Sequence, residues 1–136
     1  MFLSDDARTT AGILLLTIVA VEYGGIFMLR VLRGSVPSTP FQRSFARAGH
    51  AHAGVLVLAA LICQVLADAA DLGGLHGALA RSGVPLAAIL FPAGFFLSSM
   101  GKGRTEPNRL IWLLYLGGVV LAASVVALGI GLLGPR

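Results

Sequence analysis

The sequence has very little charge. Only 12% of its 136 residues are Asp, Glu, Lys or Arg, whereas 57% are hydrophobic. A water-soluble domain carries about twice this charge, because polar groups must cover its surface. The shortage excludes an ordinary soluble domain and leaves lipid as the natural solvent, as the mean hydropathy of +0.89 also indicates. The length is that of one domain.

Cysteine is nearly absent, and so are the motifs of catalysis. The single Cys63 excludes an intramolecular disulfide and a Cys-x-x-Cys pair. The sequence also lacks a glycine-rich phosphate loop and a nucleophile elbow, so nothing in it favours an enzyme. The net charge of +4 comes from residues that lie between apolar segments. This pattern indicates membrane orientation, and we expect no nucleic-acid partner.

Long apolar stretches are what the sequence does contain. A helix needs about 20 apolar residues to cross the hydrocarbon layer. Four stretches satisfy this length, at residues 10–32, 47–67, 84–100 and 108–133. Pro85 suits the first turn of the third helix. We therefore expect an all-α, single-domain integral membrane bundle of four helices. A weak likeness between residues 54–60 and 118–123 favours two tandem helical hairpins.

The basic residues are distributed unevenly between the two ends of these helices. The first and third loops and their borders hold most of them: Arg30, Arg33, Arg43, Arg47, Lys102, Arg104 and Arg109. The opposite end holds only Arg8, Arg81 and Arg136. Because basic loops stay in the cytoplasm, both termini are predicted to lie outside.

Small residues should hold the bundle together, because lipid tails are as apolar as leucine and burying leucine gains little. Gly24 and Gly25 in the first helix and the small residues around His50 are candidates for close helix contacts. Gly118 and Ala122 have the spacing of a small-xxx-small contact in the fourth helix.

Glu22 is an ionisable residue within the first apolar stretch. It precedes Arg30 by eight residues, which places it roughly 12 Å below the cytoplasmic edge. A carboxyl group at this depth costs at least about 2.5 kcal/mol, so it should be neutralised or paired by another helix. The adjacent Tyr23 points about 100° away around the helix.

Two histidines open the second apolar stretch. His50 and His52 are about 200° apart on a helix, so they cannot chelate one metal from one face. His50 shares its face with Gln64, and we place that face inside the bundle. His52 then points to a lipid-facing groove, another subunit or the headgroups. These positions predict a buried polar site of Glu22, Tyr23, His50 and Gln64.

The stretch Arg-Ala-Gly-His-Ala-His-Ala-Gly at residues 47–54 resembles the His-Ala-His helix of haem-copper oxidase and nitric oxide reductase catalytic subunits. The resemblance implies a b-type haem on His50 or His52, without oxygen or nitric oxide chemistry, because the other metal-site histidines of that family are absent. The whole chain is similar to small four-helix membrane proteins of high-GC bacteria with a His-x-His second helix. That likeness implies the bacterial cytoplasmic (inner) membrane and no particular activity.

A haem or copper ion would need a second ligand on a facing helix. Met28 and Met100 lie about two residues from Arg30 and Lys102, near the depth of His50. Three functions therefore remain open at this point. The chain binds a small ligand or handles protons at Glu22 and His50; it holds haem or copper; or it is a structural accessory subunit. Each is compatible with a homo-oligomer or a larger membrane complex in the lipid bilayer.

Overall fold

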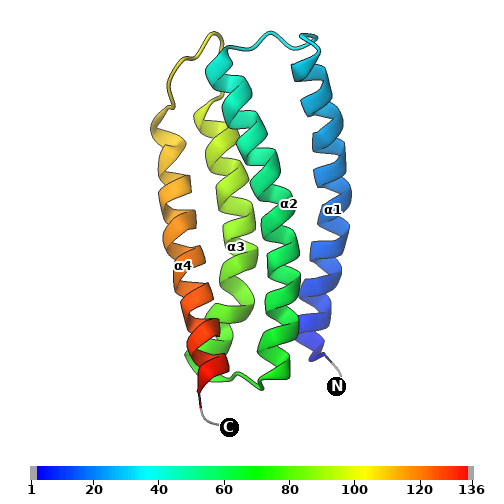
Figure 1. Ribbon diagram of the computed structural model, residues 1–136, viewed down its shortest axis with the longest axis vertical. Helices are drawn as coiled ribbons and strands as arrows, with labels where there is room; N and C mark the ends of the chain where they lie inside the picture. Colours follow the sequence, from blue (N-terminus) through cyan, green and yellow to red (C-terminus); the bar gives the residue numbers. More distant parts are fainter. Residues whose placement is uncertain (1–2, 135–136) are drawn as a thin grey trace.

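The computed structural model describes residues 3–134, which form an all-α bundle of four long helices (Figure 1). Pro135 and Arg136, which the sequence analysis places at the outer end, lie outside the described residues. The helices are α1 (Asp5–Leu32), α2 (Pro40–Ala69), α3 (Gly74–Ser98) and α4 (Trp112–Leu133), with a short 3₁₀ helix η1 (Arg109–Ile111) before α4. All four are long and apolar enough to cross a membrane.

Local signals explain where most helices begin. The Ser4 side chain accepts a hydrogen bond from the backbone N–H of Ala7 and caps α1. Thr39 and Gln42 form a capping box at the start of α2, and Pro40 occupies its first turn. Both termini of the described chain lie at one end of the bundle, so successive helices run in opposite directions (Figure 1).

The third helix corrects the sequence prediction. It begins at Gly74, ten residues before the expected start, so Pro85 lies inside the helix and not in its first turn. The sequence prediction assigned residues 68–83, with Gly73, Gly74 and Gly77, to a connecting loop. In the structure Gly77 and Gly83 are helical and buried, because close contacts there leave no room for a side chain.

The helices pack unequally. The extensive contacts are those of α2 with α3 and of α3 with α4, whereas α1 packs mainly on α2. A cluster that includes Val57, Ala60 and Val84 forms the core of the half that holds the two termini, which is named the outer half after the predicted orientation. A smaller cluster of Met28, Val31 and Ala46 lies near the basic end. Only 11% of the most apolar 18 residues of α1 are buried, against 33% for α2.

Glycine contacts bring α3 and α4 together. A Cβ atom on Gly94 would lie 2.7 Å from Leu114 Cγ, and one on Gly117 would lie 3.0 Å from the Phe91 ring. The predicted contact through Gly118 and Ala122 is wrong: Gly118 has open space around it. Each residue turns the helix by about 100°, so the face that meets α3 carries Gly117 and cannot also carry Gly118.

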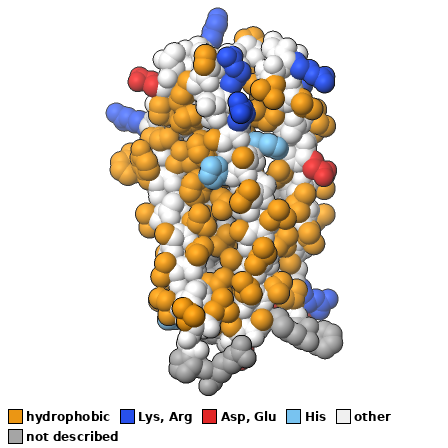
Figure 2. All heavy atoms as spheres, viewed as in Figure 1, with side chains coloured by type: hydrophobic (Ala, Val, Ile, Leu, Met, Phe, Trp, Pro, Cys, Tyr) orange, Lys and Arg blue, Asp and Glu red, His pale blue; other side chains and the backbone are white. Residues whose placement is uncertain are grey.

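The surface is that of a membrane protein. The chain exposes 8484 Å², whereas a compact soluble protein of 14.0 kDa exposes about 6,700 Å². Hydrophobic side chains cover most of the face in Figure 2, and most basic side chains gather at the end that holds the two polar loops. A multi-pass protein with lipid around its helices accounts for the hydrophobic surface and for the basic side chains at one end.

Candidate functional site

His50 lies where α1 and α2 meet. Its imidazole packs against Gly24 and Gly25 at ordinary contact distances. A Cβ on Gly24 would lie 3.4 Å from Nδ1, and a Cβ on Gly25 would lie 3.6 Å from Nε2. The side chain is half-buried, and its ring nitrogens make no hydrogen bond with any residue from 3 to 134. The glycine pair therefore accommodates the ring without giving it a polar partner.

His52 lies on the other flank of α2, against α3. Its ring is parallel to that of Phe91, at 3° and a centroid distance of 5.3 Å, and it also contacts Phe95. Nδ1 is 2.8 Å from the carbonyl oxygen of Ala48. Because a carbonyl can only accept, Nδ1 carries the proton and Nε2 is left as the acceptor nitrogen. Figure 2 shows imidazole side chains just below the basic end.

The sequence predicted that His52 points to a lipid-facing groove, another subunit or the headgroups; in the structure the half-buried ring packs on α3. The prediction assumed that only one face of the second helix would be covered. In the structure α2 is an inner helix with α1 on one flank and α3 on another, so both histidines meet protein. They remain on different flanks, as their spacing requires, and do not form a pair.

Glu22 does not take the buried position that the sequence analysis gave it. Its side chain is exposed on α1, and within the described chain it forms no hydrogen bond or ion pair, with His50 or any other residue. Tyr23 is also exposed, at 74%. The physical reason is helix rotation. Gly24 and Gly25 face α2, so Glu22 and Tyr23, one to three positions earlier on the same helix, project from other flanks.

Gln64 is buried, but it serves a different part of the fold. It follows His50 by 14 residues, about 21 Å along the helix, so it belongs to the outer half. Its Nε2 donates to the backbone carbonyl of Arg81 at 2.6 Å. That carbonyl lacks its usual helical donor, because residue 85 is proline. Gln64 therefore satisfies a polar group that Pro85 leaves free.

A polar cluster at the outer end was not predicted from the sequence. The Arg81 guanidinium donates to Asp68 Oδ1, at 3.0 Å from Nε and 2.8 Å from Nη2, and to the carbonyl of Leu72 at 2.6 Å. The backbone N–H of Ser4 donates to Asp68 Oδ2 at 2.7 Å. This outer clasp, defined as Ser4, Asp68 and Arg81, joins the start of α1, the end of α2 and α3. The available signal was an arginine in the same predicted connection as two acidic residues, Asp68 and Asp71.

The predicted methionine ligands are not brought to the histidines. Met28 is buried in the apolar cluster with Val31 and Ala46, one helical turn nearer the basic end than His50. Met100 is 62% exposed, on the rim of an apolar groove that α1, α2 and α3 form. Across residues 3–134, no group of three or more His, Cys, Asp or Glu side chains is placed to hold a metal ion.

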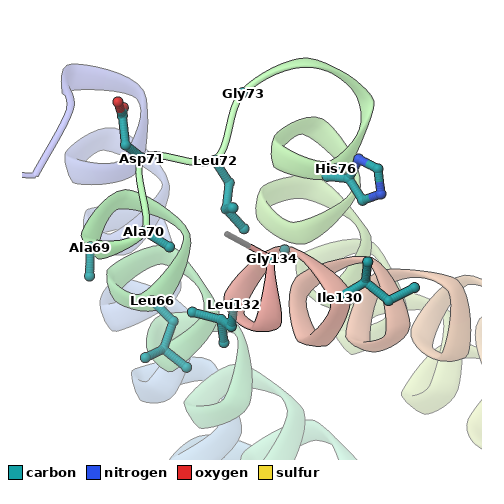
Figure 3. Close-up of a pocket in the computed structure, with 11 residues that line it drawn as sticks. Leu66, Ala69, Ala70, Asp71, Leu72, Gly73, His76, Ile130, Leu132 and Gly134 are labelled. Carbon is teal, nitrogen blue, oxygen red and sulfur yellow. The ribbon is translucent and has the colours of Figure 1, made fainter. Parts of the chain in front are cut away.

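A hollow at the outer end does not make a second site. It lies between the α2–α3 connection and the end of α4. Figure 3 shows Asp71 and His76 on opposite sides of it, with Leu72 between them. The other lining residues are glycine, alanine, leucine and isoleucine. One carboxylate and one imidazole that do not converge cannot form an acid–base or metal centre.

Comparisons with family models, with curated proteins and with solved structures find no match to this chain.

Proposed function

We propose that this chain is a small, non-enzymatic protein of the bacterial cytoplasmic membrane that binds a proton at His50, in the half of the bundle near the cytoplasm. The observation that carries the proposal is the setting of His50. It is an imidazole without a hydrogen-bond partner among residues 3–134, held between two membrane helices against Gly24 and Gly25. Ionisable groups inside a membrane are usually functional.

A proton fits this position better than a larger ligand. Neither the hollow at the outer end nor the apolar groove at the basic end includes His50. Histidine is also the side chain whose charge ordinarily changes between about pH 5 and 8. Arg47, one turn nearer the basic end, is exposed, so water on the cytoplasmic side lies close to the imidazole.

The structure favours proton binding at His50 over proton conduction across the membrane. Between His50 and Gln64 the buried positions of α2 are apolar, at Leu56, Val57, Ala60 and Cys63. This stretch offers no relay of polar side chains inside one chain. We propose instead that protonation changes the charge between α1 and α2 and so modulates how the protein assembles, in a homo-oligomer or in a larger membrane complex.

Histidine-selective ¹⁵N NMR of the protein in micelles or nanodiscs tests proton binding. The chain has three histidines, and His50→Gln, His52→Gln and His76→Gln assign their signals. If His50 binds a proton, its signal should change with pH. His76, exposed at the opposite end, is the matched control. A His50 signal that stays constant while that of His76 changes would refute the proposal.

A second candidate function is haem or copper binding, and one observation favours it. The hydrogen bond from His52 Nδ1 to Ala48 leaves Nε2 as the nitrogen that can bind a metal, an arrangement typical of ligating histidines. A second ligand would have to come from outside the described part of this chain. An optical spectrum and metal analysis of the native protein decide the question: a Soret band or stoichiometric copper that His52→Gln removes would support it, and a sample with neither would exclude it.

A further inference from the structure

The flank of α1 that carries Glu22 is a surface without a partner among residues 3–134. We infer that it binds the same flank of a second copy, so that two Glu22 carboxyl groups meet inside the membrane. The inference extends the part of the proposed function that concerns assembly, and it does not depend on the protonation of His50.

The carboxyl group supplies the first reason. Glu22 lies roughly 12 Å below the level of Arg30 and is exposed on a helix that is mostly uncovered. A carboxyl group that faces only acyl chains has no hydrogen-bond donor or acceptor within reach, which is costly at this depth. A partner with a polar group at the same depth removes that cost.

The spacing of the neighbouring residues supplies the second reason. Exposed apolar residues lie on both sides of Glu22 at alternating intervals of four and three. Together they form the Glu22 seam: Leu15, Val19, Glu22, Ile26 and Leu29. The side chains that interlock in a left-handed helix pair have the same alternating spacing of four and three residues. Left-handed pairing is the common packing of membrane helices. A single polar residue in such a seam specifies the register of the two helices.

A second copy fits this seam better than a different protein. Two copies in one membrane have the same orientation, so an axis along the membrane normal places their Glu22 residues at equal depth. Two carboxyl groups are complementary when at least one is protonated, because each group can then donate to or accept from the other. No other charged side chain of α1 lies between Arg8 and Arg30, so the pair would be alone at this level.

Cysteine cross-linking in native membranes tests the surface. In a Cys63→Ala background we compare Leu15→Cys with Ile13→Cys. These two positions are 56% and 61% exposed, but Leu15 lies about 20° from Glu22 around the helix, whereas Ile13 lies about 180° away. We expect oxidation to produce a species of twice the monomer mass for Leu15→Cys and none for Ile13→Cys. Equal yields at the two positions, no cross-link, or a cross-link to a different protein would each overturn the inference.

Two substitutions of Glu22 test the role of the carboxyl group. Glu22→Gln keeps hydrogen bonding and should preserve the dimer, whereas Glu22→Leu should weaken it by about three- to tenfold, the range expected for a hydrogen bond between membrane helices. Fluorescence energy transfer over a series of protein-to-lipid ratios measures this change. An unchanged dimer fraction in Glu22→Leu would contradict the assigned role. A dimer that persists while the His50 signal does not change with pH would refute only the proposed proton site. A His50 signal that changes with pH in a protein that forms no dimer would refute only the Glu22 seam.

Discussion

Two regions of the molecule place polar groups in apolar surroundings in opposite ways. One is the outer clasp, and the other is the depth at which His50 and Glu22 lie, named the histidine level. In the outer clasp the Asp68 side chain is only 6% exposed, and both its oxygens receive hydrogen bonds, from Arg81 and Ser4. At the histidine level, His50 and Glu22 have no such partners within residues 3–134. The clasp is complete in one chain, whereas the histidine level is not.

This difference separates structural polar groups from functional ones. A buried ion pair whose hydrogen bonds are all made has a sufficient role in holding helices together. Polar groups that remain unpaired in the same membrane need something that the isolated chain does not supply. We therefore assign Ser4, Asp68 and Arg81 to the fold and look for proton binding and assembly at His50 and Glu22.

Breaking the clasp should have the largest effect. Arg81→Met leaves the Asp68 carboxylate buried without its cation, and it should lower the free energy of unfolding by about 3 kcal/mol. Unfolding in mixed micelles, followed by circular dichroism, measures the change. Arg8→Met is the control. Its ion pair with Asp5 is exposed, so the unfolding free energy should stay the same. Equal effects of the two substitutions would contradict the structural role of the clasp.

The packing of α3 on α4 should be the next most sensitive feature. Gly83→Ala would place a Cβ atom in direct overlap with Ser124 Oγ, so the helices must separate, at a cost of about 2 kcal/mol. Gly118→Ala, which has open space around it, is the control and should not destabilise the bundle. Adding Ser124→Gly should restore most of the loss. If the Gly83→Ala variant is as stable as the Gly118→Ala variant, α3 and α4 do not make a close contact at Gly83 and Ser124.

The contact between Gln64 and Arg81 should show a smaller and conditional effect. Gln64→Leu removes the donor to the Arg81 carbonyl and should cost about 1 kcal/mol. In a Pro85→Ala background, residue 85 has an N–H group that can donate to the same carbonyl, so the cost should nearly vanish. A double-mutant cycle in mixed micelles measures this coupling. Additive effects would mean that Gln64 does not compensate for Pro85.

The sequence predicted the number and type of the helices, because long apolar stretches with few charges have few alternatives in a membrane. It did not predict the start of α3. Residues 68–83 were assigned to a connection, with Gly77 among its signals, but in the structure Gly77 and Gly83 are helical and allow close contacts with Leu72 and Ser124. Which of these meanings a glycine has depends on what packs against it, and the local sequence does not contain that information.

The pairing of the polar residues was harder to predict, and the reason is rotation. A helix that is apolar on every side does not indicate which flank meets its neighbour, so Glu22 and His50 were paired on depth alone. The structure shows His50 against Gly24 and Gly25, with Glu22 on an exposed flank. Depth along a helix follows from counting residues, whereas the direction of a side chain requires the neighbouring helix.

The smallest effect concerns His52, and it sharpens the distinction between the two histidines. If packing on α3 is its main role, His52→Phe keeps the stacked ring on Phe91 and should change the unfolding free energy by less than about 0.5 kcal/mol, whereas His52→Ala should cost about 1 kcal/mol. Unfolding in mixed micelles measures both variants. A loss for His52→Phe as large as that for His52→Ala would mean that the nitrogen atoms matter more than the ring. His52 would then join His50 as a polar group whose partner the single chain does not provide.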